Sequence, residues 1–282
     1  MYGLQQAIRF IRQNGSPVEQ ARLDVLIGKP RPIEALRQFM VSQRGDGGWA
    51  PFWAGDYSSL DATCFHLAQA QQLAIHVNEP PFENGLRFLA ERQRDDRSWE
   101  EDPSVADQAP PWAKPGELPA HLYLTANCAF WLAASPVFLD SALQGARYLS
   151  AYLDENGKLP SFLHTHWLCG GLWGRLGMVD ETGRVLACLA GNMAGLSACQ
   201  LAWMVTALRI TGLPTEDALI QSAIPTLVSS QQEDGRWASD DGPAFDVHAT
   251  LETLYALKLC GIIDPDQFIG EEESKIPPIL NN

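Results

Sequence analysis

A seven-residue signature that recurs three times constrains this chain more than any other feature. In each copy a Gln stands six residues before a Trp, and an Asp follows the Gln by three residues. The copies run over Gln43–Trp49, Gln93–Trp99 and Gln231–Trp237. A fourth, degenerate copy occupies 153–159, where Asn156 replaces the Asp and Leu159 replaces the Trp. Self-similarity at periods near fifty residues predicts a repeat architecture.

The sequence around the signature repeats as well. Each full copy closes an amphipathic stretch, and its Asp then marks a turn (stretches 32–42, 82–92 and 218–230). A second, more apolar helix is expected after each turn, beginning near Ser59, Leu122 and Asp246. Further helices are expected over 4–13, 18–27, 141–153, 162–172 and 194–210, which gives about six pairs. We therefore predict one all-α domain over 1–282, an α/α toroid whose inner helices surround an apolar central cavity.

The motif Gln-x-x-Asp-Gly-x-Trp, complete at 43–49 and 231–237, resembles the repeats of squalene–hopene cyclases, oxidosqualene cyclases and protein prenyltransferase β-subunits. The resemblance covers most of the chain and is specific for that superfamily, although not for one activity within it. It implies a single-toroid member in which the signature Gln and Trp side chains tie neighbouring helices together. The chemistry is reasonable, because a Gln amide can bond exposed backbone groups at a helix end while an indole packs over it.

The charge balance narrows the classes of partner. The chain has 34 Asp and Glu against 20 Lys and Arg, a net charge of -14. This disfavours nucleic acids and anionic membrane surfaces, which reward basic patches, and it weakens a diphosphate site. No Asp-Asp-x-x-Asp sequence is present to hold Mg²⁺ against a diphosphate, so ionisation-initiated terpene synthesis is disfavoured. We expect a hydrophobic, uncharged isoprenoid-type small molecule as partner, and no cofactor.

Other sequence features bear on the cellular compartment of the protein, on membrane insertion and on the long irregular stretch of the chain. The six cysteines lack the paired spacing of disulfides or zinc sites, so we expect buried free thiols in a reducing compartment and a cytoplasmic location. The N-terminus has no apolar core of a cleaved signal. Residues 185–208 carry no charge, but Gly191, Asn192 and Gly195 predict a turn between two helices instead of a membrane span. The acidic, Pro-rich stretch 95–120 is either a lid or binding loop, or a tolerated insertion.

The candidate acids stand at the heads of two inner helices. Asp61 lies two residues before a Thr, as does the acid-bearing Asp-x-Thr of hopene and oxidosqualene cyclases, and the resemblance implies that it protonates an alkene or epoxide. Ser59 and Ala62 stand where hopene cyclases carry supporting carboxylates. Asp246 and His248, from the matching head of another helix, are alternatives. The alternative interpretation, which is slightly favoured because an N-terminal Asp is common on helices, is that both Asp residues are helix N-cap or first-turn groups.

A cyclase cavity also needs aromatic faces, which stabilise carbocations by cation–π attraction. The residues that we expect to contact substrate are aromatic or His side chains on the inner helices and at the mouth of the ring: Trp53, Phe65, Trp131, His164, His166, Trp167 and Trp203.

The resemblance offers zinc-dependent thiolate activation as a second mechanism. Its ligands are an Asp and a Cys two residues apart and a His before a Thr. Here Ser197 takes the place of the Asp beside Cys199, and Ala249 stands where the His should be, with His248 one residue away. Too few donors remain for a tetrahedral site, so we expect no metal, and elemental analysis would reveal about one zinc per chain if this is wrong.

One further group, His164, His166 and Cys169, lies within six residues. These side chains could bind a metal or transfer a proton near neutral pH. On a helix, however, residues 164 and 166 point about 200° apart, so the alternative is an inner wall lined by His and Trp.

The sequence thus favours a terpenoid cyclase-like enzyme that cyclises or isomerises an uncharged isoprenoid or polyene by protonation. The alternative is a non-catalytic toroid that binds a lipid or a protein partner.

Overall fold

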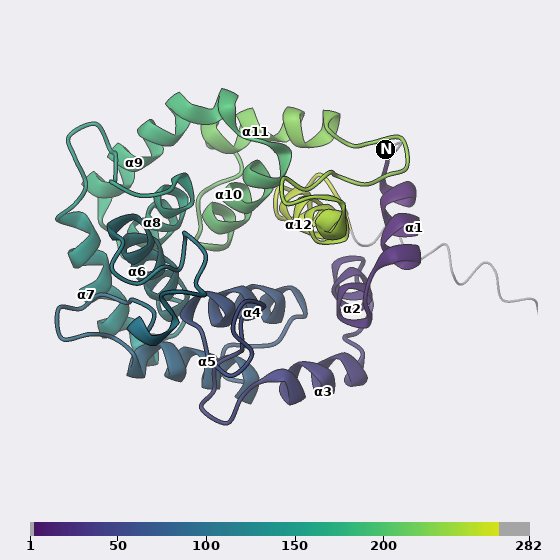
Figure 1. Cartoon of the computed structure of the whole chain (residues 1–282). Coiled ribbons are helices and arrows are strands. Elements are labelled where there is room, and N and C mark those ends of the chain that lie inside the picture. Colours follow the sequence, from purple (N-terminus) through teal and green to yellow (C-terminus); the bar gives the residue numbers. More distant parts are fainter. Residues whose placement is uncertain (1–2, 265–282) are drawn as a thin grey trace, which may run out of the picture.

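The computed structural model describes residues 3–264, which form twelve α-helices in two concentric layers (Figure 1). The outer layer consists of α1 (Leu4–Asn14), α3 (Ile33–Ser42), α5 (Pro80–Glu91), α7 (Leu139–Ser150), α9 (Val179–Asn192) and α11 (Ala218–Ser229). The inner layer consists of α2 (Pro17–Leu26), α4 (Leu60–Gln72), α6 (Leu118–Leu132), α8 (Leu163–Arg175), α10 (Ala198–Ile210) and α12 (Asp246–Leu259).

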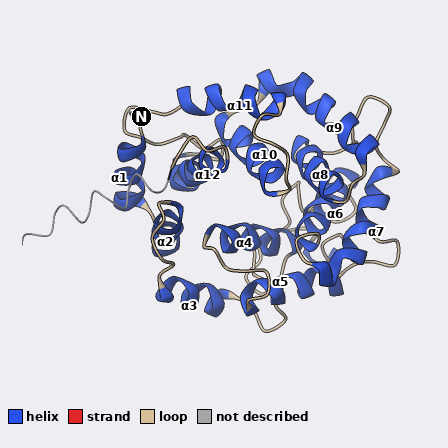
Figure 2. Cartoon of the chain, turned by 180° about the vertical axis from the view of Figure 1, so that it is seen from behind, coloured by secondary structure: helices blue, strands red, loops and turns tan. Residues whose placement is uncertain are grey.

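Outer and inner helices alternate along the chain and make six pairs, and Figure 2 shows the same ring from behind. The predicted all-α toroid is therefore confirmed. The turn predicted between two helices at Gly191–Gly195 is also found, as a short 3-10 turn (Met193–Gly195) between α9 and α10. Helix α6 begins four residues earlier than expected, at Leu118, since a proline at the second helical position needs no hydrogen-bond acceptor.

The four signature copies adopt the same turn. The backbone N–H of Arg44 donates to the Gly48 carbonyl over 2.9 Å. The matching bonds in the other copies run from Arg94 to Ser98, from Asp154 to Lys158 and from Gln232 to Arg236, over 3.0, 3.0 and 2.9 Å. The degenerate copy at 153–159 is thus a true member of the repeat.

Each signature Gln ties its own turn to the next outer helix. The Gln43 Nε2 donates to the Gly47 carbonyl over 2.8 Å and to the Pro81 carbonyl, at the start of α5, over 2.9 Å. Gln93 reaches the Ser141 carbonyl in α7 in the same way, over 3.1 Å. The last copy closes the ring, because Gln231 donates to the Gly3 carbonyl, just before α1, over 2.7 Å. The structural role predicted for these Gln residues is confirmed.

Close approach at the ring closure also explains a glycine of the last copy. Gly235 has a φ of 95°, in the left-handed region, and a Cβ added there would lie 2.3 Å from the backbone carbonyl carbon of Gln6 in α1. Only glycine combines this backbone conformation with contact against another helix.

The signature Trp side chains fill the space between the layers. Trp49, Trp99 and Trp237 are all buried, and the indole N–H groups of the last two donate over 2.7 Å to the Leu89 and Leu227 carbonyls of the preceding outer helices. In the degenerate repeat, Trp173 of α8 supplies the indole instead and donates to the Ala146 carbonyl of α7 over 3.1 Å.

At the end of the ring opposite the signature turns, basic side chains near the C-terminus of one inner helix bind the C-terminal carbonyls of the next inner helix. Arg175 of α8 donates to the Ile210 carbonyl of α10 over 2.6 Å. Arg209 of α10 donates to the Leu259 carbonyl of α12 over 3.0 Å, and Lys258 of α12 to the Val25 carbonyl of α2 over 3.3 Å. Cations are favourable here because helix C-termini leave carbonyls unpaired and carry partial negative charge.

Within residues 3–264, no helix has the combined length and apolarity needed to cross a lipid bilayer.

Trp237→Ala tests the packing between the layers. We expect the free energy of unfolding to fall by about 3–5 kcal/mol, because the change leaves a large cavity and an unpaired Leu227 carbonyl. Chemical denaturation followed by circular dichroism measures it. Phe52→Ala is the control, since that aromatic side chain is 88% exposed and its loss should cost less than about 0.5 kcal/mol. Equal losses in the two variants would contradict the assignment.

Candidate functional site

The head of α4 is built around a carboxylate from the following loop. Glu101 accepts hydrogen bonds from the Ser59 hydroxyl over 2.6 Å and from the Tyr57 hydroxyl over 2.8 Å. It also accepts, over 3.2 Å each, from the backbone N–H groups of Leu60 and Asp61. These two groups belong to the first turn of the helix and have no partner within it, so Glu101 caps α4 and fixes the backbone that carries Asp61.

Glu101 is only 1% exposed. Its burial raises the pKa of the carboxyl, and the bonds from Ser59 and Tyr57 oppose the rise. Sequence reasoning missed this residue. Its one signal is that it stands two residues after the signature Trp99, at the start of a stretch whose path back to α4 cannot be read from the chain.

The Asp61 carboxyl is held on both oxygens. The indole N–H of Trp112 donates to Oδ2 and the Tyr123 hydroxyl donates to Oδ1, each over 3.0 Å. The Asn127 amide in turn donates to the Tyr123 oxygen over 3.2 Å. Burial raises the pKa of Asp61, and the bonds from Trp112 and Tyr123 oppose the rise. Each oxygen keeps a second lone-pair position, so the group can carry a proton while both bonds persist.

Aromatic rings from five inner helices meet beside this carboxyl. We call them the aromatic cluster: Phe65 (α4), Tyr123 (α6), His164 and Trp167 (α8), Trp203 (α10) and His248 (α12). Their ring centroids are linked in sequence, from Phe65 to His248 (5.3 Å), His248 to Trp203 (6.3 Å), Trp203 to His164 (5.6 Å), and His164 to Trp167 (4.5 Å) and Tyr123 (6.4 Å). Phe65, one helical turn beyond Asp61, is 45% exposed, so the cluster borders open space.

His248 joins this cluster to a buried ionic network. Its Nδ1 lies 3.5 Å from Nη1 of Arg22 and 3.9 Å from the Glu252 carboxylate. Arg22 donates to Glu252 over 2.7 Å and also to Gln72, whose amide donates to Glu252 over 2.9 Å. Burial lowers the pKa of His248, which keeps the imidazole neutral at pH 7. The network joins α2, α4 and α12, the elements on either side of the ring closure.

The second candidate acid, Asp246, is held by contacts with the residues that precede α12. Asp246 accepts from the backbone N–H of Ser239 over 2.8 Å, and its other oxygen lies 3.1 Å from Nε of Arg236. It stands at the start of α12 and joins the helix to the last signature turn.

Three of the expected substrate contacts lie away from the aromatic cluster. His166 accepts from the backbone N–H of Leu159, the residue that replaces the signature Trp, over 3.0 Å. In the full repeats a Thr hydroxyl accepts the matching bond from the backbone N–H of the signature Trp (Thr63, Thr125 and Thr250). Trp131 packs on Phe82 near the other end of α6. Trp53 lies in the loop before α4, against the ring of Tyr57, and its buried N–H has no acceptor among the described residues.

In the described part of the chain, no three His, Cys, Asp or Glu side chains are grouped as metal ligands. All six cysteines are free, five of them buried and Cys188 partly exposed. The expectation of buried, unpaired thiols therefore holds for five of the six, and Cys188 is the exception. Burial raises the pKa of Cys169, so this thiol stays protonated at neutral pH.

The raised pKa of Asp61 predicts a pH-dependent difference in stability between the protein and its Asp61→Asn variant. Because the folded protein holds this proton more tightly than the unfolded chain, the native Asp61 loses stabilising effect as pH rises from about 4 through the raised pKa. The asparagine does not titrate. The unfolding free energy of the wild type should thus fall relative to the variant as pH rises from about 4 through the raised pKa, as measured by denaturant titration. A constant difference would show that Asp61 titrates normally.

Comparison with solved structures finds this fold in the type II terpene cyclase MstE from Scytonema. Two MstE variants match with TM-scores of 0.63 (in complex with the product merosterolic acid A) and 0.62 (in complex with the substrate geranylgeranyl dihydroxybenzoate). Identity is 14% in both, over 93% of this chain and 97% of that chain. A protein from Actinoplanes matches with a TM-score of 0.59 at 18% identity, over 92% and 98%. No protein-family model and no curated protein sequence matches. The chain therefore has the fold of a type II terpene cyclase.

Proposed function

We propose that this protein binds an uncharged isoprenoid or polyene and cyclises or isomerises it by protonation, with Asp61 as the acid. The observation that carries the proposal is the setting of Asp61, a carboxyl of raised pKa held by Trp112 and Tyr123 beside the aromatic cluster. The shared fold with the type II terpene cyclase MstE, which binds geranylgeranyl dihydroxybenzoate as substrate and merosterolic acid A as product, supports the same class of chemistry.

The reaction needs only an acid, a base and a shaped apolar space. The proton leaves Asp61 and adds to one carbon of a terminal alkene, or opens an epoxide, which leaves a carbocation on the neighbouring carbon. The π electrons of the next alkene form a carbon–carbon bond to that cation and move the charge along the chain. A C–H proton then passes to a base, for which the neutral His248 imidazole in the aromatic cluster is the candidate, and an alkene is restored, so the isomerisation is balanced without an oxidant. The faces of Phe65 and Trp203 would stabilise the passing charge.

The two alternative acids take different parts in this scheme. Asp246 is committed to the Ser239 N–H and the Arg236 guanidinium, so we assign it to holding the head of α12. His248 lies in the aromatic cluster with a neutral ring, which makes it the second candidate for proton transfer at this site.

Substrate access would involve the loop between Trp99 and α6. Trp112 of this loop is 38% exposed and bonds Asp61 directly. Asp61 lines neither the polar cavity of about 400 Å³ beside the head of α4 nor the cavity at the opposite end of the ring. We infer that outward movement of the Trp112 segment admits substrate and that its return excludes water, the lid alternative for residues 95–120.

Asp61→Asn tests the acid. The variant keeps the size of the side chain and one oxygen, which can accept from the Trp112 N–H, while the Tyr123 hydroxyl can accept from the new amide N–H. It should therefore fold but lose conversion of a polyene or its epoxide by at least about a hundredfold, the usual contribution of general acid catalysis. Purified variants would be incubated with a panel of isoprenoids and the products analysed by gas chromatography–mass spectrometry. Asp246→Asn is the matched control and should only weaken turnover.

Two outcomes would count against the proposal. Full turnover by Asp61→Asn would remove Asp61 from the mechanism. Absence of turnover by the wild type with every panel member would favour the non-catalytic alternative, a toroid that binds a lipid or a protein partner.

Trp112→Phe tests the lid contact separately. The change keeps an aromatic ring but removes the N–H that stabilises the Asp61 carboxylate, so the pKa of Asp61 should rise further. Because the protonated acid is the active form, activity should persist to higher pH than in the wild type. A pH–rate profile measures this shift, and an unchanged or lowered midpoint would show that the Trp112 bond does not tune the acid.

A further inference from the structure

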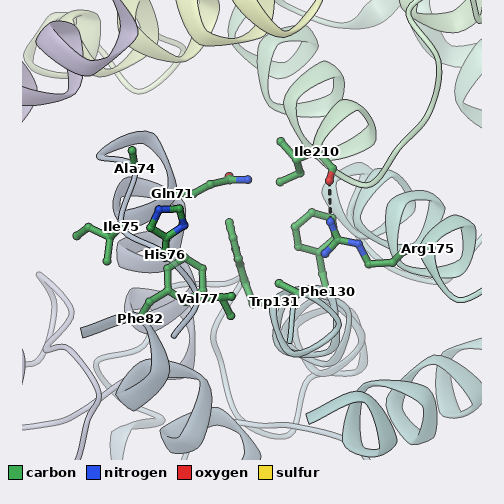
Figure 3. A pocket seen from close by; sticks show the side chains of 11 residues that line it. Gln71, Ala74, Ile75, His76, Val77, Phe82, Phe130, Trp131, Arg175 and Ile210 are labelled. Atoms are coloured by element: carbon green, nitrogen blue, oxygen red, sulfur yellow. Dashed lines mark hydrogen bonds between the residues drawn. The ribbon is translucent and has the colours of Figure 1, made fainter. Parts of the chain in front are cut away.

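A cavity of about 250 Å³ lies at the end of the ring where the inner helices finish (Figure 3). Its wall is made by the end of α4 and the residues after it, by Phe82 of α5, by the end of α6, and by the last residues of α8 and α10. Gln71, in this wall, is ten residues beyond Asp61 on α4, which corresponds to about 15 Å along the helix. The cavity is therefore distinct from the site around Asp61.

Three polar side chains line this cavity, namely Gln71, His76 and Arg175, and two of them face each other from opposite walls. Figure 3 shows the Gln71 amide pointing across the cavity toward the Arg175 guanidinium. Arg175 is partly buried, and burial alone lowers its pKa. Among the described residues no carboxylate lies within ion-pair distance of it, although the chain as a whole is strongly acidic.

A comparison with Arg209 shows that Arg175 has donors to spare. Both arginines cap the next inner helix at this end of the ring. Arg209 uses all three guanidinium nitrogens on backbone carbonyls, Nε and Nη2 on Leu259 and Nη1 on Leu213. Arg175 uses only Nη2, on Ile210. Its remaining N–H groups lie on the cavity wall without a protein acceptor in residues 3–264.

Apart from the exposed His76, the rest of the wall is apolar and aromatic, with Phe82, Phe130 and Trp131 as its largest members. The volume of the cavity limits the size of the ligand that it can hold. An engineered apolar cavity of about 150 Å³ holds one benzene molecule, so this one accommodates a ring or a short chain together with a polar head. An apolar cavity with a few converging polar groups is the usual form of a small-molecule site.

We propose that this cavity binds a small monocarboxylate with an apolar body, its carboxylate between Arg175 and Gln71 and its body against Phe82, Phe130 and Trp131. A carboxylate matches the fork of N–H donors of an arginine and accepts from an amide as well. This site is independent of the reaction proposed for Asp61, and its test requires no turnover.

Isothermal titration calorimetry with three probes tests the proposal. Octanoate has both the head and the body, 1-octanol has only the body, and acetate has only the head. Octanoate should bind more tightly than either. Arg175→Gln, which keeps a donor for the Ile210 carbonyl, should weaken octanoate about tenfold or more while leaving 1-octanol within about twofold.

Lys258→Gln is the matched control, because it removes one positive charge from the same end of the ring but from outside the cavity wall. It should leave octanoate affinity within about twofold. Should Arg175→Gln fail to fold, Gln71→Leu serves in its place and should weaken octanoate selectively. Equal affinity for octanoate and 1-octanol, equal losses in Arg175→Gln and Lys258→Gln, or no octanoate binding by the wild type would each overturn the proposal.

Discussion

The amide of the signature Gln joins neighbouring repeats at three places in the ring, one of them the closure. It bonds a carbonyl of its own turn and a carbonyl at the start of the next outer helix, so one side chain sets both the reversal of the chain and the distance to the next repeat. The cost of an unbonded amide in this position would be high, because polar groups that are removed from water need partners. In the last copy the same bond reaches Gly3, and a linear array becomes a closed ring.

Closure has consequences for chemistry at both ends of the ring. The inner helices present their first turns at one end, where Glu101 caps α4 and the Asp61 carboxyl meets Trp112 and Tyr123. They present their carbonyl ends at the other, where Arg175, Arg209 and Lys258 bind the neighbouring helices. The candidate acid and the cationic side chains that cap the helix ends are thereby separated by the length of a helix.

Much of the architecture was predictable from the sequence because it depends on local patterns. The spacing of Gln, Asp and Trp, and the change from amphipathic to apolar helix within each pair, predicted six pairs and the all-α ring. The start of α6 was misplaced by four residues, since a Pro near its first turn was taken as part of the irregular stretch. The degenerate copy kept its turn because the Asp154 side chain takes over bonds to the Asn156 and Lys158 N–H groups.

The sequence by itself determined the repeat, the layers and the position of Asp61 at the head of an inner helix, because these follow from short-range spacing. Only the tertiary structure decided what surrounds that carboxyl. Tyr123 is 62 residues away from it and Trp112 is 51 residues away, and no periodicity connects such partners. It also decided that His166 bonds a turn while His164 joins the aromatic cluster, since residues two apart on a helix face different neighbours. Contacts of this kind are fixed by the closure of the ring, which brings together side chains whose separation along the chain carries no signal.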